Sequence, residues 1–83
     1  MYKLVFEKRA LKQLNKLDEF AKRRIWDKIQ LCKENPFHYL EPLIQIKGFK
    51  LRVGDYRIIL DIKDNKLLIF VLEMGHRKEV YRR

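Results

Sequence analysis

Cysteine is almost absent from this sequence, and no long apolar run occurs in it. The single cysteine, Cys32, excludes an intramolecular disulfide and a metal cluster built on cysteine ligands. Its place in a helical row of apolar residues predicts a small core side chain without catalytic function. His38 has no second histidine, cysteine or carboxylate at metal-ligand spacing, so we expect no metal site and no cofactor.

Apolar runs stay well below the roughly 20 residues that a membrane span needs, and the sequence shows no internal repeat or low-complexity segment. Its first residues enter an alternating strand pattern directly, without the basic segment and apolar core of a secretory signal. We therefore expect a soluble, cytoplasmic protein that does not bind a membrane. The whole chain, residues 1–83, is expected to form a single domain.

Acidic residues are few compared with basic ones. Twenty lysines and arginines stand against eleven aspartates and glutamates, which gives a formal net charge of +9. A charge of this size on so short a chain predicts an anionic partner, such as nucleic acid, an acidic protein or an anionic membrane surface. Composition alone favours nucleic acid among these partners, and it carries no information about the fold.

Hydrophobic periodicity predicts a strand over residues 2–6 followed by two amphipathic helices. Asp18 is expected to cap the second helix, because its carboxylate can accept a hydrogen bond from a first-turn amide. Asn35-Pro36 is expected to end that helix, and residues 37–43 are predicted to form a loop. The two apolar stripes consist of Ala10, Leu11, Leu14 and Leu17 in the first helix and Ala21, Ile25, Ile29 and Cys32 in the second.

The centre of the sequence predicts a β-hairpin that brings cations face to face. Apolar and charged residues alternate on both sides of Gly54-Asp55, a pair suited to a two-residue II′ turn. In that register Arg52 lies directly opposite Arg57, with Lys50 one pleat further on. Like charges opposed across a ladder destabilise it. The hairpin therefore indicates an anion-binding face, although a merely solvated outer face is an alternative.

The remaining strands complete an α+β domain. The unbroken apolar run 67–72 fits a strand covered on both faces, which Gly75 is expected to end, and a last short strand or turn is expected over 79–81. The predicted architecture is an antiparallel β-sheet with an N-terminal strand and a two-helix hairpin packed on one face. The cations of the hairpin then lie on the face turned away from the helices.

Two segments resemble the RelE/ParE superfamily of toxins from type II toxin–antitoxin pairs. Residues 51–59 read Leu-Arg-Val-Gly-Asp-Tyr-Arg-Ile-Ile, and residues 71–81 read Val-Leu-Glu-Met-Gly-His-Arg-Lys-Glu-Val-Tyr. The opening, in which a strand leads into a helix at Arg9-Ala10-Leu11, is similar as well. The basic and tyrosine positions are more similar to the RelE branch, which cleaves mRNA in the ribosomal decoding site, than to the ParE branch, which acts on DNA gyrase. The resemblance implies a RelE-like fold.

The resemblance also implies a set of functional residues. Where some relatives carry a further lysine, this sequence has Gly48, and Lys47 is its nearest substitute. The residues that match catalytic positions are Lys50, Arg57, Arg77 and Tyr81. The further residues expected to bind RNA are Lys47, Arg52, His76 and Lys78.

These residue types suit cleavage of RNA by attack of a 2′-hydroxyl on the adjacent phosphate. That reaction needs a base, stabilisation of charge on phosphorus and protonation of the leaving oxygen. Lys50 can serve as the base, because nearby guanidinium groups disfavour its ammonium form, and Arg57 suits bidentate contact with the phosphate. Arg77 suits the leaving-group side, and Tyr81 could stack on a splayed base. His76 is open to an acid or base role or to a structural one.

Two other functions remain open from the sequence: a ParE-like inhibitor of DNA gyrase and a noncatalytic basic RNA-binding module. For a toxin of the RelE type, the implied partners are mRNA, the ribosome and a cognate antitoxin similar to RelB. We expect that antitoxin to be acidic and partly disordered, because an extended acidic chain that folds onto the basic surface would mask it.

Overall fold

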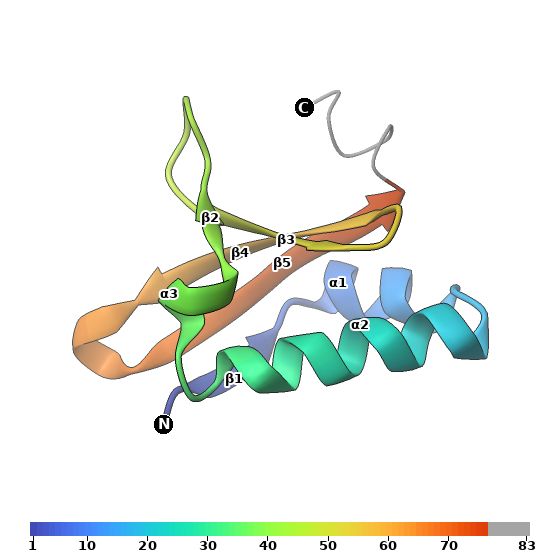
Figure 1. Ribbon diagram of the computed structural model, residues 1–83, viewed down its shortest axis with the longest axis horizontal. Helices are drawn as coiled ribbons and strands as arrows, with labels where there is room; N and C mark the ends of the chain where they lie inside the picture. Colours follow the sequence, from blue (N-terminus) through green and yellow to red (C-terminus); the bar gives the residue numbers. More distant parts are fainter. Residues whose placement is uncertain (77–83) are drawn as a thin grey trace.

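Two helices follow the first strand and lie under one face of a five-stranded sheet (Figure 1). The computed structural model describes residues 1–76, and this part contains helices and strands in the α+β arrangement that the sequence predicts. None of the helices in residues 1–76 combines the length and apolar character that crossing a membrane would require. In chain order the elements are β1 (Lys3–Phe6), α1 (Lys8–Asn15), α2 (Glu19–Cys32), α3 (Pro36–Tyr39), β2 (Glu41–Pro42), β3 (Phe49–Val53), β4 (Tyr56–Lys63), the 3₁₀ helix η1 (Asp64–Lys66) and β5 (Leu68–His76).

The strands lie in the order β1-β5-β4-β3-β2. Three of the four pairings are antiparallel, as expected, whereas β1 pairs with β5 in parallel. The parallel pairing differs from the predicted all-antiparallel sheet, because β1 is joined to the rest of the sheet through helices and no tight turn constrains its direction. Strand β5 is thereby flanked by β1 and β4, so the apolar run does form an interior strand. The expected cover on both faces is not found among residues 1–76, because Phe70 and Leu72 are only half-buried.

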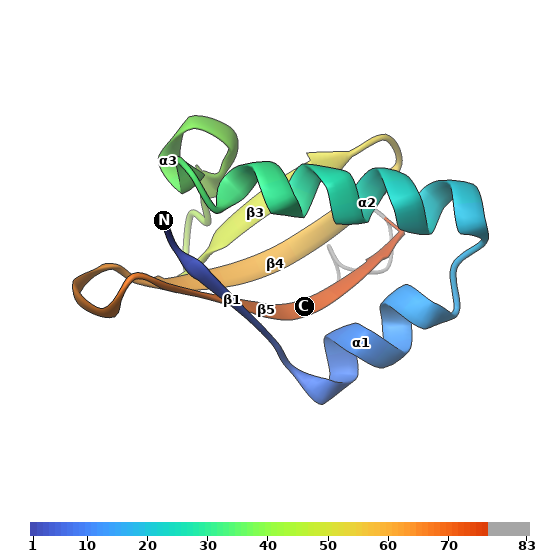
Figure 2. The ribbon, with the colours of Figure 1, turned by 90° about the horizontal axis from the view of Figure 1, so that it is seen from below.

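Both predicted helices form, and the α2 stripe is as expected, but Leu17 of the first predicted stripe lies beyond the end of α1. The Asp18 side chain accepts a hydrogen bond from the Ala21 amide at 2.8 Å and caps α2 as predicted. Within the α1 stripe Ala10 and Leu14 are buried, whereas Leu11 lies at the exposed margin. Figure 2 shows α2 running across the sheet over β3 and β4, with α1 nearer the end of β5.

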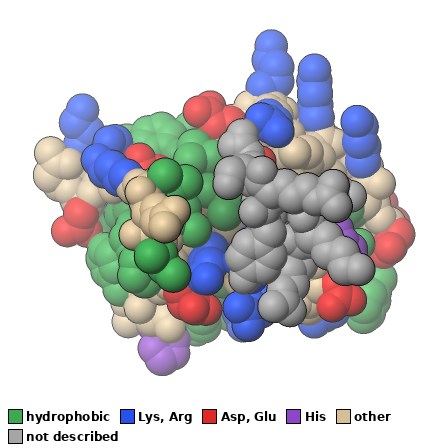
Figure 3. Space-filling view, turned by 90° about the horizontal axis from the view of Figure 1, so that it is seen from above, with side chains coloured by type: hydrophobic (Ala, Val, Ile, Leu, Met, Phe, Trp, Pro, Cys, Tyr) green, Lys and Arg blue, Asp and Glu red, His purple; other side chains and the backbone are tan. Residues whose placement is uncertain are grey.

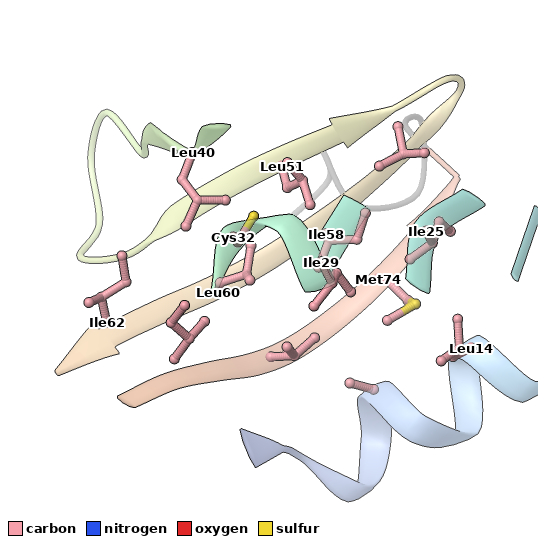
Figure 4. Packing of buried hydrophobic residues seen from close by; sticks show 14 residues of the cluster. Leu14, Ile25, Ile29, Cys32, Leu40, Leu51, Ile58, Leu60, Ile62 and Met74 are labelled. Carbon is pink, nitrogen blue, oxygen red and sulfur yellow. The ribbon is translucent and has the colours of Figure 1, made fainter. Parts of the chain in front are cut away.

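The helix side of the sheet is occupied by one continuous core (Figure 4). Side chains of α2 such as Ile25 and Ile29 meet strand residues such as Leu51 and Ile58, and all four are at most 1% exposed. Each buried side chain of this size contributes about 1.5–3 kcal/mol of transfer free energy. Cys32 is part of this core as predicted, and burial raises the pKa of its thiol to about 11. The face of the sheet turned away from α1 and α2, called the outer face below, is therefore the one available for polar chemistry.

A β-bulge changes which side chains of β5 reach the outer face. Ile59 pairs with Glu73 and Leu60 pairs with Val71, so Leu72 is an extra residue between them. Because of this extra residue, Val71 and Met74 both face the core, and Glu73 faces outward beside Ile59.

Strand β5 does not end where the sequence suggested. It continues through Gly75 to His76, so the prediction that Gly75 ends the strand is wrong. The predicted loop 37–43 is also wrong in part, because it contains α3 and the two-residue strand β2. These elements are too short to show a recognisable period. The last short strand or turn expected over 79–81 lies outside the described residues.

Where β1 ends, helix α1 continues the contacts along β5. The Glu7 amide donates to the carbonyl oxygen of Val71 at 2.9 Å. Six residues later the Gln13 side-chain oxygen accepts a hydrogen bond from the Met74 amide at 2.7 Å. The helix therefore supplies, through one side chain, a hydrogen bond that a neighbouring strand would otherwise make.

Gly54 is held in a conformation that side chains disfavour. Its φ is +58°, as the first central position of a II′ turn requires. A Cβ atom there would lie 3.1 Å from Nη1 of Arg24, whose side chain reaches the turn from α2. The turn is therefore fixed by its own backbone and by a contact from the helix layer.

We predict that Gly54→Ala lowers the free energy of unfolding by about 1–2 kcal/mol, because an L-residue with positive φ costs about that much. Urea unfolding followed by circular dichroism measures the change. Asp55→Ala, at the neighbouring exposed turn position, is the control and should change stability by less than about 0.5 kcal/mol. Equal effects of the two substitutions would contradict the account of the turn.

Candidate active site

The hairpin register brings two arginines directly opposite each other. Arg52 pairs with Arg57 and Val53 pairs with Tyr56 across the two-residue turn, as the sequence predicts. Lys50 pairs with Ile59 and shares the outer face with both arginines. Directly opposed residues have Cβ atoms about 4.5–5.5 Å apart, and like charges at such positions destabilise the ladder by a few tenths of a kcal/mol. We call Lys50, Arg52 and Arg57 the cationic cluster.

The three cations differ in their exposure to solvent. Arg52 is exposed and Lys50 is half-buried, whereas Arg57 is only 3% exposed. Strand β4 lies between β3 and β5, so Arg57 has neighbouring strands on both sides. Burial of a guanidinium is costly unless other groups interact with it, and Arg57 does interact with another group of the protein. Its head group is therefore fixed in position rather than free to move in solvent.

Glu73 is a carboxylate in this region that the sequence analysis did not identify. Ile59 lies between Lys50 on one side and Glu73 on the other, while Arg57 lies opposite Gly75. Glu73 is therefore diagonal to Arg57 on the outer face, and it is only 8% exposed. Its Oε1 atom lies 3.7 Å from Nη2 of Arg9, which belongs to α1.

The sequence held little signal for this role of Glu73. Strict alternation from the buried Val71 would direct Glu73 into the core, and only the bulge at Leu72 turns it outward. One negative charge so close to the cationic cluster reduces the repulsion among its members and adds an electrostatic link to α1.

A second carboxylate lies at the edge of the cluster. Glu41 in β2 pairs with Lys50 in β3, and its side chain is exposed. Opposite charges across a ladder attract by about 0.2–1 kcal/mol. Glu41 therefore competes with any incoming anion for Lys50, but it lies on the far side of β3 from Arg57.

His76 lies apart from the cationic cluster. It pairs with Tyr56, and the two rings meet edge to face with centroids 5.9 Å apart. Directly paired residues point to the same face of a sheet, and Tyr56 pairs with the buried Val53 as well as with His76. His76 therefore points to the face that carries the core and not to the outer face.

The remaining predicted residues are distributed as follows. Lys47 is exposed in the segment between β2 and β3 and borders a hollow at the opposite end of β4 from Arg57. Arg77, Lys78 and Tyr81 lie outside the described residues. Among residues 1–76, no three side chains of the metal-ligating types come together.

Figure 3 views the outer face. Hydrophobic side chains form much of its visible surface, and basic side chains stand at its margins and near its middle. The half-buried apolar residues that the register assigns to this face include Ile59 and Phe70. The surface therefore combines cations for phosphate with apolar area on which bases can lie.

Comparison with known proteins supports the resemblance drawn from the sequence. Residues 4–81 match the family model described as the ParE toxin of the type II toxin–antitoxin system parDE. The chain is 32% identical over 85 aligned residues to the mRNA interferase toxin RelE of Escherichia coli. The alignment covers 96% of this chain and 90% of that protein.

Solved structures show the same fold. A chain of the intact Escherichia coli RelBE toxin–antitoxin complex is 28% identical, with a TM-score of 0.78, over 92% of this chain and 96% of that one. A chain of the toxin–antitoxin complex RelBE2 from Mycobacterium tuberculosis is 24% identical, with a TM-score of 0.83, over 92% of this chain and 98% of that one. The opposed arginines, the fold and the family match together lead to one conclusion: the chain belongs to the RelE/ParE family and is a RelE-like toxin of the type II toxin–antitoxin class.

Proposed function

We propose that this toxin is a metal-independent endoribonuclease that cleaves mRNA in the ribosomal decoding site. The observation that carries the proposal is the direct opposition of Arg52 and Arg57, with Lys50 on the same face. Such a cluster attracts a phosphate, because a bound anion removes the repulsion between the two guanidinium groups. The name of the Escherichia coli relative, mRNA interferase toxin RelE, supports the same chemistry.

In the proposed reaction, the 2′-hydroxyl oxygen attacks the neighbouring phosphorus and the bond to the 5′-oxygen breaks. Negative charge grows on the phosphoryl oxygens as the five-coordinate state forms. Arg57 is only 3% exposed, so the groups over it must move aside before a phosphate can reach it. Once the phosphate is bound, a guanidinium held in place needs little reorganisation when the charge appears. Its two parallel N–H donors match two phosphoryl oxygens.

The two proton transfers require further groups. Lys50 is the proposed base, since its flexible stem starts from the same face as the arginines and lets its amine reach a hydroxyl beside the bound phosphate. We assign Arg77 to the leaving oxygen, as an acid or as an electrostatic equivalent, and Tyr81 to the orientation of a base. Both assignments rest on the resemblance of the C-terminal segment to the family.

The function is tested by primer extension on translating ribosomes. The proposal predicts breaks at codon-associated positions that persist when a chelator is added. Absence of breaks under these conditions would overturn the proposal. Binding of RNA with a steep salt dependence and no cleavage would instead identify a noncatalytic module.

Inhibition of DNA gyrase is the second candidate, because the family model that matches the chain is that of the ParE toxin. A gyrase supercoiling assay distinguishes the two candidates. Inhibited supercoiling together with intact mRNA would favour this candidate over the ribonuclease.

We predict that Arg57→Ala and Arg77→Ala each lower the cleavage rate by at least about 10²-fold, the usual effect of removing a preorganised stabiliser of transition-state charge. Arg57→Lys should also be slow, because lysine keeps the charge but loses the bidentate geometry. Single-turnover rates on ribosome-bound mRNA measure the effect.

The matched control for these variants is Arg23→Ala. Arg23 is an exposed helix arginine whose Nε atom lies 3.6 Å from Asp27, and its loss should leave the rate unchanged. Urea unfolding of each variant separates a loss of function from a loss of fold. Near-normal rates in both Arg57→Ala and Arg77→Ala would show that the phosphate-binding roles are wrong.

The proposed partner is a dedicated acidic antitoxin that covers the outer face. The net charge of +9 favours an acidic partner, and the similar solved chains come from toxin–antitoxin complexes. Exposed ion pairs contribute only about 0–1 kcal/mol each. Apolar contacts with residues such as Ile59 and Phe70 must therefore supply most of the affinity.

We predict that the antitoxin co-purifies with this toxin when both are expressed from the native operon. Raising the salt concentration should slow formation of the complex, because charge steers the encounter, yet the formed complex should persist because apolar contacts hold it. Stopped-flow association and gel filtration at increasing salt measure the two effects. Dissociation with a steep salt dependence, or absence of any partner, would contradict this mechanism.

A further inference from the structure

A second group of basic side chains lies on the outer face, at the opposite end of β4 from the cationic cluster. A hollow in this region is lined by three lysines, one aspartate, one amide side chain and three apolar side chains. The segment between β2 and β3, which contributes one of the lysines, stands up from the outer face in Figure 1. We call this feature the lysine hollow, and its lining residues used here are Lys47, Lys63, Asn65, Lys66, Leu68 and Phe70.

Cations outnumber anions in the lysine hollow. Asp64 also lines it, so three lysines stand against one carboxylate, which accepts a hydrogen bond from the Tyr2 hydroxyl. Asp61 lies nearby, with its Oδ2 atom 3.7 Å from Nζ of Lys63. Lys47 and Lys66 are both exposed in this structure, so the hollow has positive charge available for an anion.

Phe70 gives the lysine hollow an aromatic surface. It pairs with Asp61 in the β4–β5 ladder and faces outward, half-buried. Asn65 adds an amide group that can both donate to and accept from a base edge. A cationic rim beside an aromatic ring is the combination that proteins use to hold single-stranded nucleic acid, since the cations contact phosphates and a base stacks on the ring.

The position of the hollow suits the same RNA strand that the cationic cluster would bind. Arg57 and Lys63 both belong to β4 and both face outward, six residues apart. At about 3.3 Å per residue, their Cα atoms are separated by about 20 Å. Half-buried apolar residues, Ile59 and Leu72 among them, lie between the two basic ends, and Figure 3 shows hydrophobic side chains between the basic groups at the left margin and those farther right.

We propose that the lysine hollow is a second RNA-binding subsite, which holds a phosphate and a stacked base of single-stranded RNA several nucleotides from the phosphate at Arg57. The proposal rests on the proposed ribonuclease function, because it assumes that RNA lies across the outer face. An acidic peptide is the competing occupant, because it too would contact the lysines. RNA is favoured because the Phe70 ring offers a surface on which a base can stack.

The subsite is tested by measuring the affinity of the full-length toxin for single-stranded RNA that cannot be cleaved. In 2′-O-methyl RNA the attacking hydroxyl is blocked, so binding is measured without ribosomes and without turnover. Oligonucleotides of about 4 and about 12 nucleotides span the range of single-strand site sizes. The short one can occupy only one basic end at a time, and we expect it at the cationic cluster, whereas the long one reaches both basic ends.

The informative variant is Lys63→Ala/Lys66→Ala, and the matched control is Lys8→Ala/Lys12→Ala, which removes two exposed lysines from α1. The first variant should lower the affinity for the long RNA at least about tenfold more than the control does. It should also reduce the slope of log K against log salt by about 0.7, the value for one lost phosphate contact on a single strand. Its affinity for the short RNA should equal that of the control.

Phe70→Leu separates stacking from charge. This substitution keeps the site apolar but removes the aromatic ring. It should lower the affinity for the long RNA about fivefold or more and leave the slope of log K against log salt unchanged. An equal loss of affinity for the long RNA in both double-lysine variants would overturn the subsite. An acidic peptide of Asp and Glu residues is measured as a second ligand, and the subsite is also overturned if Lys63→Ala/Lys66→Ala weakens binding of this peptide but not of RNA. These binding measurements do not depend on cleavage. They can therefore contradict the subsite while the ribosome assay supports cleavage, and they can support the subsite while the ribosome assay shows no cleavage.

Discussion

The opposition of Arg52 and Arg57 across the β3–β4 hairpin is the constraint on which the rest of this structure depends. Like charges directly opposed across a ladder repel each other by a few tenths of a kcal/mol. A hairpin free to slip would relieve this repulsion. Here a two-residue turn at Gly54 sets the register, and Val53 and Leu51 fix it further because they must face the core. Core packing thus maintains a charge arrangement that is unfavourable by itself.

As a result, one face of the sheet contributes to stability and the other carries the charged groups. The helix side closes a continuous core, which provides the free energy of folding. The outer face carries the cationic cluster at one end and the lysine hollow at the other, with apolar residues between them. Glu73 is diagonal to Arg57 and is linked to Arg9, so that one carboxylate moderates the repulsion among the cations.

Much of this was predictable from the sequence, because the informative signals are local. The turn at Gly54-Asp55, the opposed arginines and the cap at Asp18 depend on residues within a few positions of one another, and all three are confirmed. The parallel partner of β1 depends on contacts between residues more than 60 positions apart, which no local period records. The bulge at Leu72 reverses the alternation beyond it, and for that reason the outward position of Glu73 was not foreseen.

The repulsion between Arg52 and Arg57 can be measured directly through Arg52→Ala. Because Arg52 is exposed, its removal creates no cavity. Urea unfolding of the free variant should give a free energy equal to that of the unaltered toxin or higher by a few tenths of a kcal/mol. Uncleavable RNA should raise the free energy of unfolding of both proteins. The increase should be smaller in the variant than in the unaltered toxin by about 1.5 kcal/mol or more, the usual value of a charged hydrogen bond. A variant that is less stable when free and gains as much from RNA as the unaltered toxin would contradict the account.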